Sequence, residues 1–440
     1  MSSITIRPVE VPLCAEITPP GSKSLTNRVL PIAALARGVS RLYGVLESED
    51  TQMMMNALKE MGCRLDYDPT QATAVVESDG VGWGAPSPLT LFCANSGTTL
   101  RFLAGMCCAG RGVFTLDGVP RMRERPLGDL ISGLRSLGAR LECDLNEGFP
   151  PVTIFADGLP GGVATIPGQV SSQFLSALLM VSPLAQNPVV LKTRGKLVSR
   201  PYVDMTLAVM RAFGATVEEK EPSEEGISSE FHIPPRQTYR AADYTIEPDA
   251  SAASYFFASA AVASGSVRVR NLTRDALQGD VRFCDRLEEM GCRVEYASDS
   301  ILVARDPNTP LRGIDTDMHF ISDTAQTLAV VALFADSPTT IRNVANMRVK
   351  ETDRIHAVVT ELQKFGARTE EWEDGFRVYP LDFDAPIPSE IRVETWNDHR
   401  MAMSFAVAGL RIPGVTILNP GCTSKTYPRF FEDLERLVSR

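Results

Sequence analysis

The chain of 440 residues lacks several features that would place it in a specialised class of protein. None of its nine cysteines forms a CxxC pair, and it has only four histidines, so we expect neither a disulfide framework nor a metal site. Its apolar runs, such as 174–185, are shorter than the ~18 residues that a membrane span needs. The segment MSSITIRPVE lacks the apolar core of a signal peptide. We therefore expect a reduced, cytoplasmic protein that has no membrane partner.

The chain has more acidic than basic residues, and most of its basic residues are arginine. The net charge is −10, which argues against a nucleic-acid partner. Lysine is scarce and provides only eight of the 44 basic residues. Arginine suits bidentate binding of carboxylates and phosphates, although a composition bias would enrich it as well. The position of each cation must therefore decide whether it binds a ligand.

A short phrase recurs along the chain: a hydrophobic residue, a glycine and a small residue, followed by a strand-like run. Each phrase closes an amphipathic stretch, which predicts a helix that ends at the glycine. The intervals between the glycines are 76, 76, 77 and 75 residues, and the glycines are Gly62, Gly138, Gly214, Gly291 and Gly366. The sequence therefore contains an internal repeat of about 75 residues.

Six further helical stretches are rich in alanine and leucine, apolar nearly all round, and followed by β-rich segments. They are 26–38, 98–110, 172–185, 251–265, 324–337 and 399–410. Such helices should be buried, whereas the amphipathic helices should lie outside. We predict an α/β (α+β) chain of six repeated units, three per domain, with domains at 21–240 and at 1–20 plus 241–440.

Polar or cationic groups open several of the buried helices, where free backbone N–H groups favour anions. Each has a plainer interpretation: serines can cap a helix, charged runs can be solvated surface, and His399 can be a hydrogen-bonded cap. If the domains face each other, however, the cations converge on one positive cleft, which suits a small substrate with phosphates and carboxylates. These cations are Lys23, Arg28, Arg125, Lys350, Arg354, Arg400 and Lys425.

At these residues the chain resembles a known family, the 5-enolpyruvylshikimate-3-phosphate synthases (3-phosphoshikimate 1-carboxyvinyltransferases). Seven motifs occur in the family's order: GSKSLTNR, NSGTTLR, RERP, SSQFLSALL, RVKETDR, NDHRMAM and CTSKT. The resemblance implies a two-domain inverted αβ prism of βαβαββ-type units with the active site in the interdomain cleft. It also implies transfer of the enolpyruvyl group of phosphoenolpyruvate to the 5-hydroxyl of shikimate 3-phosphate, in the pathway to chorismate and aromatic amino acids. No metal and no cofactor are implied.

The resemblance also assigns site residues by motif. The first domain would hold shikimate 3-phosphate and the second phosphoenolpyruvate. Contacts to shikimate 3-phosphate are implied for Lys23, Ser24, Arg28, Ser171, Ser172, Gln173, Ser199, Tyr202, Asn346 and Lys350. Contacts to phosphoenolpyruvate are implied for Gly97, Arg125, Arg354, Arg400 and Lys425, shared with Lys23 and Gln173, and Asn95 lies in the same substrate-binding segment as Gly97.

The catalytic assignments are also implied by the resemblance. Asp323 matches the acceptor of the 5-hydroxyl proton, and Glu351 matches the acid that protonates the methylene carbon. Lys350 and Lys23 join them as catalytic residues, and the sequence does not separate Lys350 from Asp323 as the base. The cationic neighbours of Glu351 favour its ionised form, so burial and substrate charge must offset them.

Two other functions remain open. The sister enolpyruvyl transferase that acts on UDP-N-acetylglucosamine shares the fold, but its active-site loop usually carries a cysteine, and the segment RMRERPLGD has none. A non-catalytic repeat protein that binds anions would keep the arginines and lose Asp323 or Glu351, both of which are present. We expect a monomer.

Overall fold

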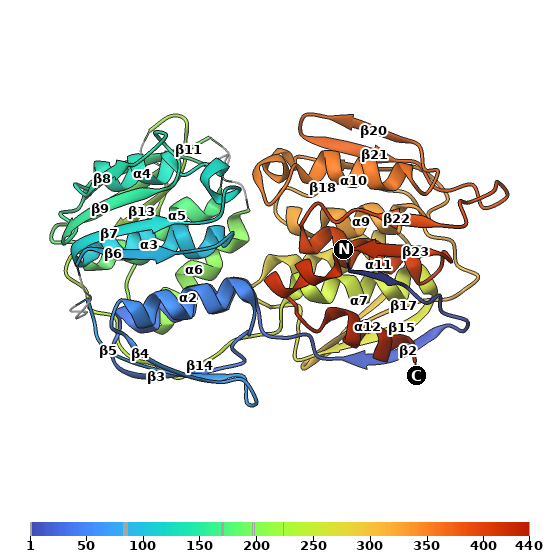
Figure 1. The fold of residues 1–440 in the computed structure, drawn as a ribbon, viewed down its shortest axis with the longest axis horizontal. Helices are drawn as coiled ribbons and strands as arrows, with labels where there is room; N and C mark the ends of the chain where they lie inside the picture. Colours follow the sequence, from blue (N-terminus) through green and yellow to red (C-terminus); the bar gives the residue numbers. More distant parts are fainter. Residues whose placement is uncertain are drawn as a thin grey trace. The chain divides into compact units, whose positions relative to one another are not determined.

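A computed structural model describes residues 2–81, 87–168, 171–195, 197, 199–222 and 224–439. The chain forms two compact units, drawn in Figure 1. Unit 1 comprises residues 1–20 and 247–440, and unit 2 comprises residues 21–246. Each unit has its own hydrophobic core. Within the described ranges, no helix is both long and apolar enough to span a bilayer.

Unit 2 contains three four-stranded sheets, each with one parallel and two antiparallel pairings. The first has the order β14 (Tyr244–Thr245), β3 (Arg37–Tyr43), β5 (Thr73–Asp79) and β4 (Arg64–Asp68). The second has the order β6 (Leu89–Phe92), β7 (Arg111–Asp117), β9 (Val152–Asp157) and β8 (Arg140–Cys143). The third has the order β10 (Gly162–Pro167), β11 (Val189–Arg194), β13 (Ile227–Ile233) and β12 (Glu218–Lys220).

Unit 1 repeats this plan with two four-stranded sheets and one three-stranded sheet. One is β16 (Arg293–Tyr296), β17 (Ser300–Arg305), β15 (Gly265–Arg270) and β2 (Leu13–Ile17). Another is β18 (Asp315–Asp317), β19 (Thr339–Arg342), β21 (Gly375–Val378) and β20 (Thr369–Trp372). The third is β1 (Ser3–Thr5), β23 (Val415–Leu418) and β22 (Ile391–Val393).

Two kinds of helix cover these sheets. The six Ala- and Leu-rich stretches form helices that are buried over most or all of their length, as predicted. They are α1 (Lys23–Leu35), α3 (Gly97–Ala109), α5 (Ser172–Val181), α7 (Ala250–Ala263), α9 (Ala325–Ala332) and α11 (His399–Gly409). The others are half-exposed: α2 (Glu49–Glu60), α4 (Gly128–Ser136), α6 (Arg200–Ala212), α8 (Phe283–Glu289), α10 (Arg354–Gln363) and α12 (Phe430–Val438). Short 3₁₀ segments connect several of them, including η3 (Gly279–Arg282), η4 (Ser322–Thr324), η5 (Ala345–Val349) and η6 (Pro420–Lys425).

The five repeated glycines confirm the helix ends that the sequence predicts. Each follows the end of an amphipathic helix with φ between +83° and +104°, a backbone region in which a Cβ atom is strained. The five strand-like runs that follow them are β4, β8, β12, β16 and β20. The α/β class and the repeated unit are therefore confirmed.

Strands that are distant in sequence from their partners complete three of the sheets. In unit 1, β2 pairs in parallel with β15, and β1 pairs antiparallel with β23. In unit 2, the late strand β14 pairs in parallel with β3. The first 20 residues, which precede the first repeat and lack a helix of their own, thus belong to sheets that are otherwise built from residues beyond 264.

Candidate active site

In unit 2, the start of α1 is tied to three other helices through Arg28. The side chain is 1% exposed and lies 5.1 Å from the Phe102 ring. Its Nε donates to Thr206 Oγ1 at 2.7 Å, and its terminal nitrogens donate to Ser24 O at 2.8 Å and Tyr202 O at 3.2 Å. Burial lowers the pKa of Arg28 to about 10. Most of its donors are thus engaged in joining the first turns of α1 and α6.

Lys23, the first residue of α1, forms an ion pair with a carboxylate that the sequence analysis does not single out. Its Nζ lies 3.4 Å from Asp50 Oδ2, and the Asp50 side chain is only 3% exposed. Ser22 caps the helix through a bond from Leu25 N at 3.3 Å. Lys23 is therefore directed by a buried counter-ion instead of lying on an outer face.

Arg125 approaches the first residue of α3 so closely that a Cβ atom there would displace its guanidinium. Its NH1 donates to Asn95 O at 3.0 Å and to Asn95 Oδ1 at 3.3 Å. A Cβ atom on Gly97 would lie 2.7 Å from Arg125 NH2 and 2.9 Å from its Cζ. The other two arginines of RMRER point elsewhere: Arg121 pairs with Glu124 and Arg123 with Asp117.

Replacing Gly97 with alanine should displace the Arg125 guanidinium, because real Cβ atoms do not approach other atoms this closely. We expect KM for phosphoenolpyruvate to rise about tenfold, or ~1.4 kcal/mol, while KM for shikimate 3-phosphate changes little. Gly128→Ala is a matched control, since its new Cβ would meet Gly148 Cα at 3.4 Å and Gly148 O at 3.9 Å, which are ordinary contacts. Unchanged KM values for Gly97→Ala in steady-state kinetics would contradict this role of Arg125.

The amide of Gln173 has a fixed orientation at the start of α5. Arg101 NH1 donates to Gln173 Oε1 at 2.7 Å, and Gln173 Nε2 donates to Thr98 Oγ1 at 3.2 Å. Arg101 is itself held by Pro126 O at 3.1 Å and lies over the Phe174 ring. Arg101 orients a predicted substrate contact, although the sequence analysis assigns it no role.

The remaining candidates of unit 2 lie at the starts of α5 and α6. Ser171 caps α5 through a bond from Gln173 N at 3.2 Å, and Ser172 follows it in the first turn. Ser199 precedes α6 with φ of +53°, a conformation that is uncommon for serine and typical of functional sites. Tyr202 stacks against Arg28 at 5.8 Å. The predicted hydroxyls thus gather at helix starts, where backbone N–H groups also lie.

In unit 1, Arg354 lies at the centre of three carboxylates. Its Nε donates to Asp398 Oδ2 at 2.6 Å, its NH2 to Glu351 Oε2 at 2.8 Å, and its NH1 to Asp323 Oδ1 at 3.2 Å. The side chain is 2% exposed. Burial alone would lower the pKa of Arg354, but the three carboxylates outweigh it and raise this pKa. The guanidinium therefore stays charged and holds the carboxylates of both predicted catalytic residues, Asp323 and Glu351, in place.

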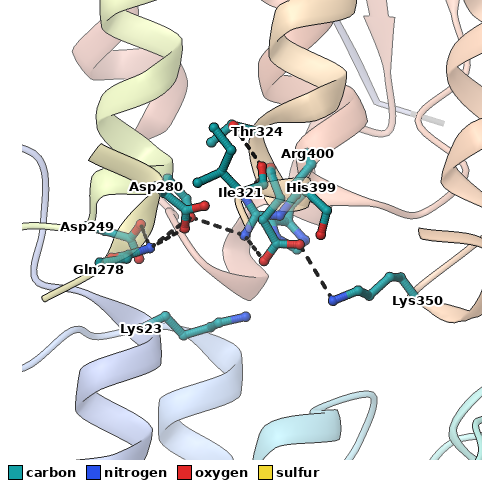
Figure 2. Close-up of polar contacts among 12 residues, drawn as sticks. Lys23, Asp249, Gln278, Asp280, Ile321, Thr324, Lys350, His399 and Arg400 are labelled. Carbon is teal, nitrogen blue, oxygen red and sulfur yellow. Dashed lines mark hydrogen bonds and ion pairs between the residues drawn. The ribbon is translucent and has the colours of Figure 1, made fainter. Parts of the chain in front are cut away.

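Asp323 brings three cations together. Besides Arg354, its carboxylate accepts from Arg400 NH2 at 2.9 Å and lies 3.7 Å from Lys350 Nζ (Figure 2). Arg400 NH1 also donates to the Asp323 carbonyl at 3.0 Å. The carboxylate is 18% exposed, so it is the least buried of the three that surround Arg354.

Lys350 differs from Arg354 in the direction of its pKa shift, which is downward. Burial lowers its pKa; Arg354 and Arg400 lower it further, while Asp323 and Glu351 oppose them. Lys425 Nζ lies 3.9 Å from Glu351 Oε1. The neighbouring candidate Asn346 donates to Ser322 Oγ at 3.1 Å, within the same group of loops. Five predicted cations and amides therefore surround two carboxylates in unit 1.

Asp398, which the sequence analysis mentions only as part of the motif NDHR, is a central partner of this cluster. It is 0% exposed and caps α11 through a bond from Arg400 N at 2.8 Å. The prediction that His399 acts as the cap is wrong, because His399 is the first residue of the helix. An aspartate directly before the His-Arg pair, at the predicted start of a buried helix, is the sequence signal that could have identified Asp398.

Over the described ranges, no group of three or more His, Cys, Asp or Glu side chains has a geometry that could hold a metal ion. Unit 1 gathers guanidinium and ammonium groups around two predicted catalytic carboxylates, and unit 2 by itself holds Lys23, Arg125 and a set of hydroxyls. Clusters of this kind are typical of one class of protein: an enzyme for small substrates that carry several negative charges.

Comparison with known proteins gives the particular family. The family model described as EPSP synthase (3-phosphoshikimate 1-carboxyvinyltransferase) matches residues 9–434. The chain belongs to this family of transferases. It is 44% identical over 440 residues to the 3-phosphoshikimate 1-carboxyvinyltransferase of Vibrio atlanticus, covering 99% of this chain and 100% of that protein. It is 45% identical over 442 residues to the one of Nostoc punctiforme, at 99% and 100% coverage.

A solved structure agrees. The EPSP synthase of Acinetobacter baumannii superposes with a TM-score of 0.81 at 25% identity, covering 99% of this chain and 98% of that one. The repeated α/β units described above are therefore the fold of this family.

Proposed function

We propose that the chain transfers the enolpyruvyl group of phosphoenolpyruvate to the 5-hydroxyl of shikimate 3-phosphate and releases phosphate. The observation that carries the proposal is the cluster around Arg354, where both predicted catalytic carboxylates, which differ in exposure, share one guanidinium with further cations beside them. Addition and elimination at an enol phosphate carbon need both a proton donor and a proton acceptor next to bound anions.

Binding of phosphoenolpyruvate follows from the cations. In unit 1, Arg354 and Arg400 offer planar guanidinium groups that can bind a carboxylate or phosphate through two hydrogen bonds. Lys425 adds a compact positive charge. Lys23 and Arg125 of unit 2 would complete the set. We propose that both clusters act on the same pair of substrates, and that the two units are the domains that close around it.

The proposed chemistry has two steps in which atoms balance. Glu351 donates a proton to the methylene carbon as the 5-oxygen bonds to C2, and the 5-hydroxyl proton passes to Asp323, which gives a tetrahedral ketal. The ketal then returns a methyl proton to Glu351 while the C2–O bond to phosphate breaks, and the proton held by Asp323 passes to the leaving phosphate oxygen. In the resting structure, Glu351 is held by Arg354 at 2.8 Å, so bound substrate charge must compete for that guanidinium before Glu351 can act as an acid.

Lys350 is the alternative to Asp323 as the base. The pH dependence of kcat/KM distinguishes that role from one in which only the charge of the Lys350 ammonium matters. Because its pKa is lowered from 10.5, a required ammonium would be lost as pH rises through a value below 10.5. We expect kcat/KM to fall over that range and the fall to move to higher pH in Lys350→Arg, whose charge persists. A profile that instead rises with pH, together with an inactive Lys350→Arg, would make Lys350 the base in place of Asp323.

The acceptor is tested by phosphate release from phosphoenolpyruvate. We expect release with shikimate 3-phosphate and none with UDP-N-acetylglucosamine. Release only with the nucleotide sugar would leave the anion clusters in place and overturn the acceptor. A folded sample that releases phosphate with neither acceptor would favour the anion-binding, non-catalytic alternative.

The proposal needs no partner beyond the two substrates, since both carboxylates and all the cations come from one chain. We propose that the enzyme acts as a monomer in the cytoplasm. Light scattering at assay concentration, in the presence of both substrates, measures the molecular mass and so the oligomeric state. A mass of twice 47.9 kDa would contradict the monomer.

A further inference from the structure

A buried polar network lies directly behind Arg400 in unit 1. Arg400 NH2 is 3.5 Å from Ser251 Oγ, and its NH1 is 3.4 Å from Tyr255 Oη. Both partners lie on α7, whose first turn contains Ser251. Figure 2 shows Asp249, Gln278 and Asp280 gathered on this side of Arg400, away from Lys350. Ser251 and Tyr255 therefore contact the same guanidinium nitrogens that Asp323 holds.

The direction of the Ser251 hydroxyl is determined by its neighbours. The oxygen donates to Asp280 Oδ2 at 2.6 Å and accepts from Gln278 Nε2 at 2.8 Å. A hydroxyl has one proton, and here a carboxylate takes it. The remaining lone pair is thus available to Arg400, which has only donors to offer.

Gln278 and Asp280 are themselves held rigidly. Gln278 Oε1 accepts from Ala250 N at 3.1 Å, which fixes the amide so that Nε2 faces Ser251 and Asp280. The backbone N–H of Gln278 donates to Glu247 Oε1 at 2.9 Å. Gln278 is 1% exposed and Asp280 is 0% exposed, so water does not compete for these bonds.

We propose that Gln278 and Asp280 are positioning residues for the reaction: they set the Ser251 hydroxyl so that its lone pair orients Arg400 toward phosphoenolpyruvate. The inference rests on the proposed role of Arg400 in binding that substrate. Without the Asp280 carboxylate, the Ser251 proton can turn toward the guanidinium, where O–H and N–H groups oppose each other. Arg400 then loses one of the contacts that hold it.

A double-mutant cycle tests the proposal in the full-length enzyme. Ser251→Ala and Asp280→Leu should each raise KM for phosphoenolpyruvate about five- to tenfold, with little change in KM for shikimate 3-phosphate. Because Asp280 acts through Ser251, adding Asp280→Leu to Ser251→Ala should have almost no further effect. Ser259→Ala is the matched control: it removes another buried hydroxyl of α7, which bonds Tyr255 O at 2.8 Å, and should leave both KM values unchanged.

Each contrary result identifies what fails. Additive effects of Ser251→Ala and Asp280→Leu, or equal rises in both KM values, would overturn the positioning role. If Arg400→Gln raises KM for phosphoenolpyruvate while Ser251→Ala does not, the inference fails and the proposed function stands. If Arg400→Gln leaves that KM unchanged, the proposed role of Arg400 fails and takes the inference with it. Should Asp280→Leu not fold, Gln278→Met replaces it in the cycle, since it removes the amide that contacts both groups.

Discussion

Replacing Glu351 with glutamine is expected to lower kcat by about 10²- to 10⁴-fold, the range contributed by a positioned proton donor. Glutamine keeps the shape of the side chain and can still accept from Arg354 NH2, which bonds Glu351 Oε2 at 2.8 Å. It cannot give a proton to carbon and take it back. The loss should therefore appear in the chemical step, while the KM values for both substrates change far less.

Single-turnover measurement of ketal formation and of product formation checks this expectation. Glu432→Gln is a suitable control, because Glu432 is 65% exposed on α12, where its Oε2 lies 3.6 Å from Arg429 Nε. A Glu351→Gln enzyme with near-normal turnover would remove Glu351 from the mechanism. A rise in KM with unchanged kcat would make Glu351 a binding group instead of an acid.

Removing the carboxylate of Asp398 should have the largest effect on stability. Asp398→Ala is expected to lower the free energy of unfolding by about 3–5 kcal/mol, the usual consequence of depriving a buried cation of its partner. Asp398 is 0% exposed, accepts from Arg354 Nε at 2.6 Å, and also caps α11. Urea unfolding, followed by the fluorescence of Trp372 and Trp396 in unit 1, measures the loss.

Asp353 provides the matched comparison. It too caps a helix, α10, and pairs with an arginine, since Arg348 NH1 lies 2.8 Å from its Oδ2. Its side chain is 40% exposed, however, so Asp353→Ala should lose only about 1 kcal/mol, the typical effect of a missing cap. Equal losses in the two variants would show that burial of the Arg354–Asp398 pair contributes nothing.

The sequence predicted most of the local structure because local structure depends on neighbours in the chain. Gly214 and Gly366 mark helix ends wherever they fold, since their φ of +83° and +89° suits glycine. The pairing of β1 with β23 could not be predicted in the same way. This pairing joins Ser3 to Leu418. A strand of only three residues has too short a pattern to identify a partner more than 400 positions away.

The same difference between local and distant information separates the residues of the candidate site. Asp323, Glu351 and Arg354 could be named from motifs because each motif keeps its own chemistry in a few consecutive residues. The partners that hold these groups come from elsewhere: Asp50 faces Lys23, and Arg101 faces Gln173 across 72 positions of sequence. Such partners are ordinary charged residues until the fold brings them together, so only the structure distinguishes them.

The strands at the start of the chain also constrain the order in which the protein can fold during synthesis. β1 and β2 leave the ribosome first, but their partners β23 and β15 lie at 415–418 and 265–270. Unit 2, whose last strand β14 ends at Thr245, has all of its residues available before unit 1 has half of its own. Because domains fold as they emerge, unit 2 should be native while residues 2–20 are still unpaired. β1 is therefore made long before β23, the strand with which it pairs, and is among the last strands to enter a sheet.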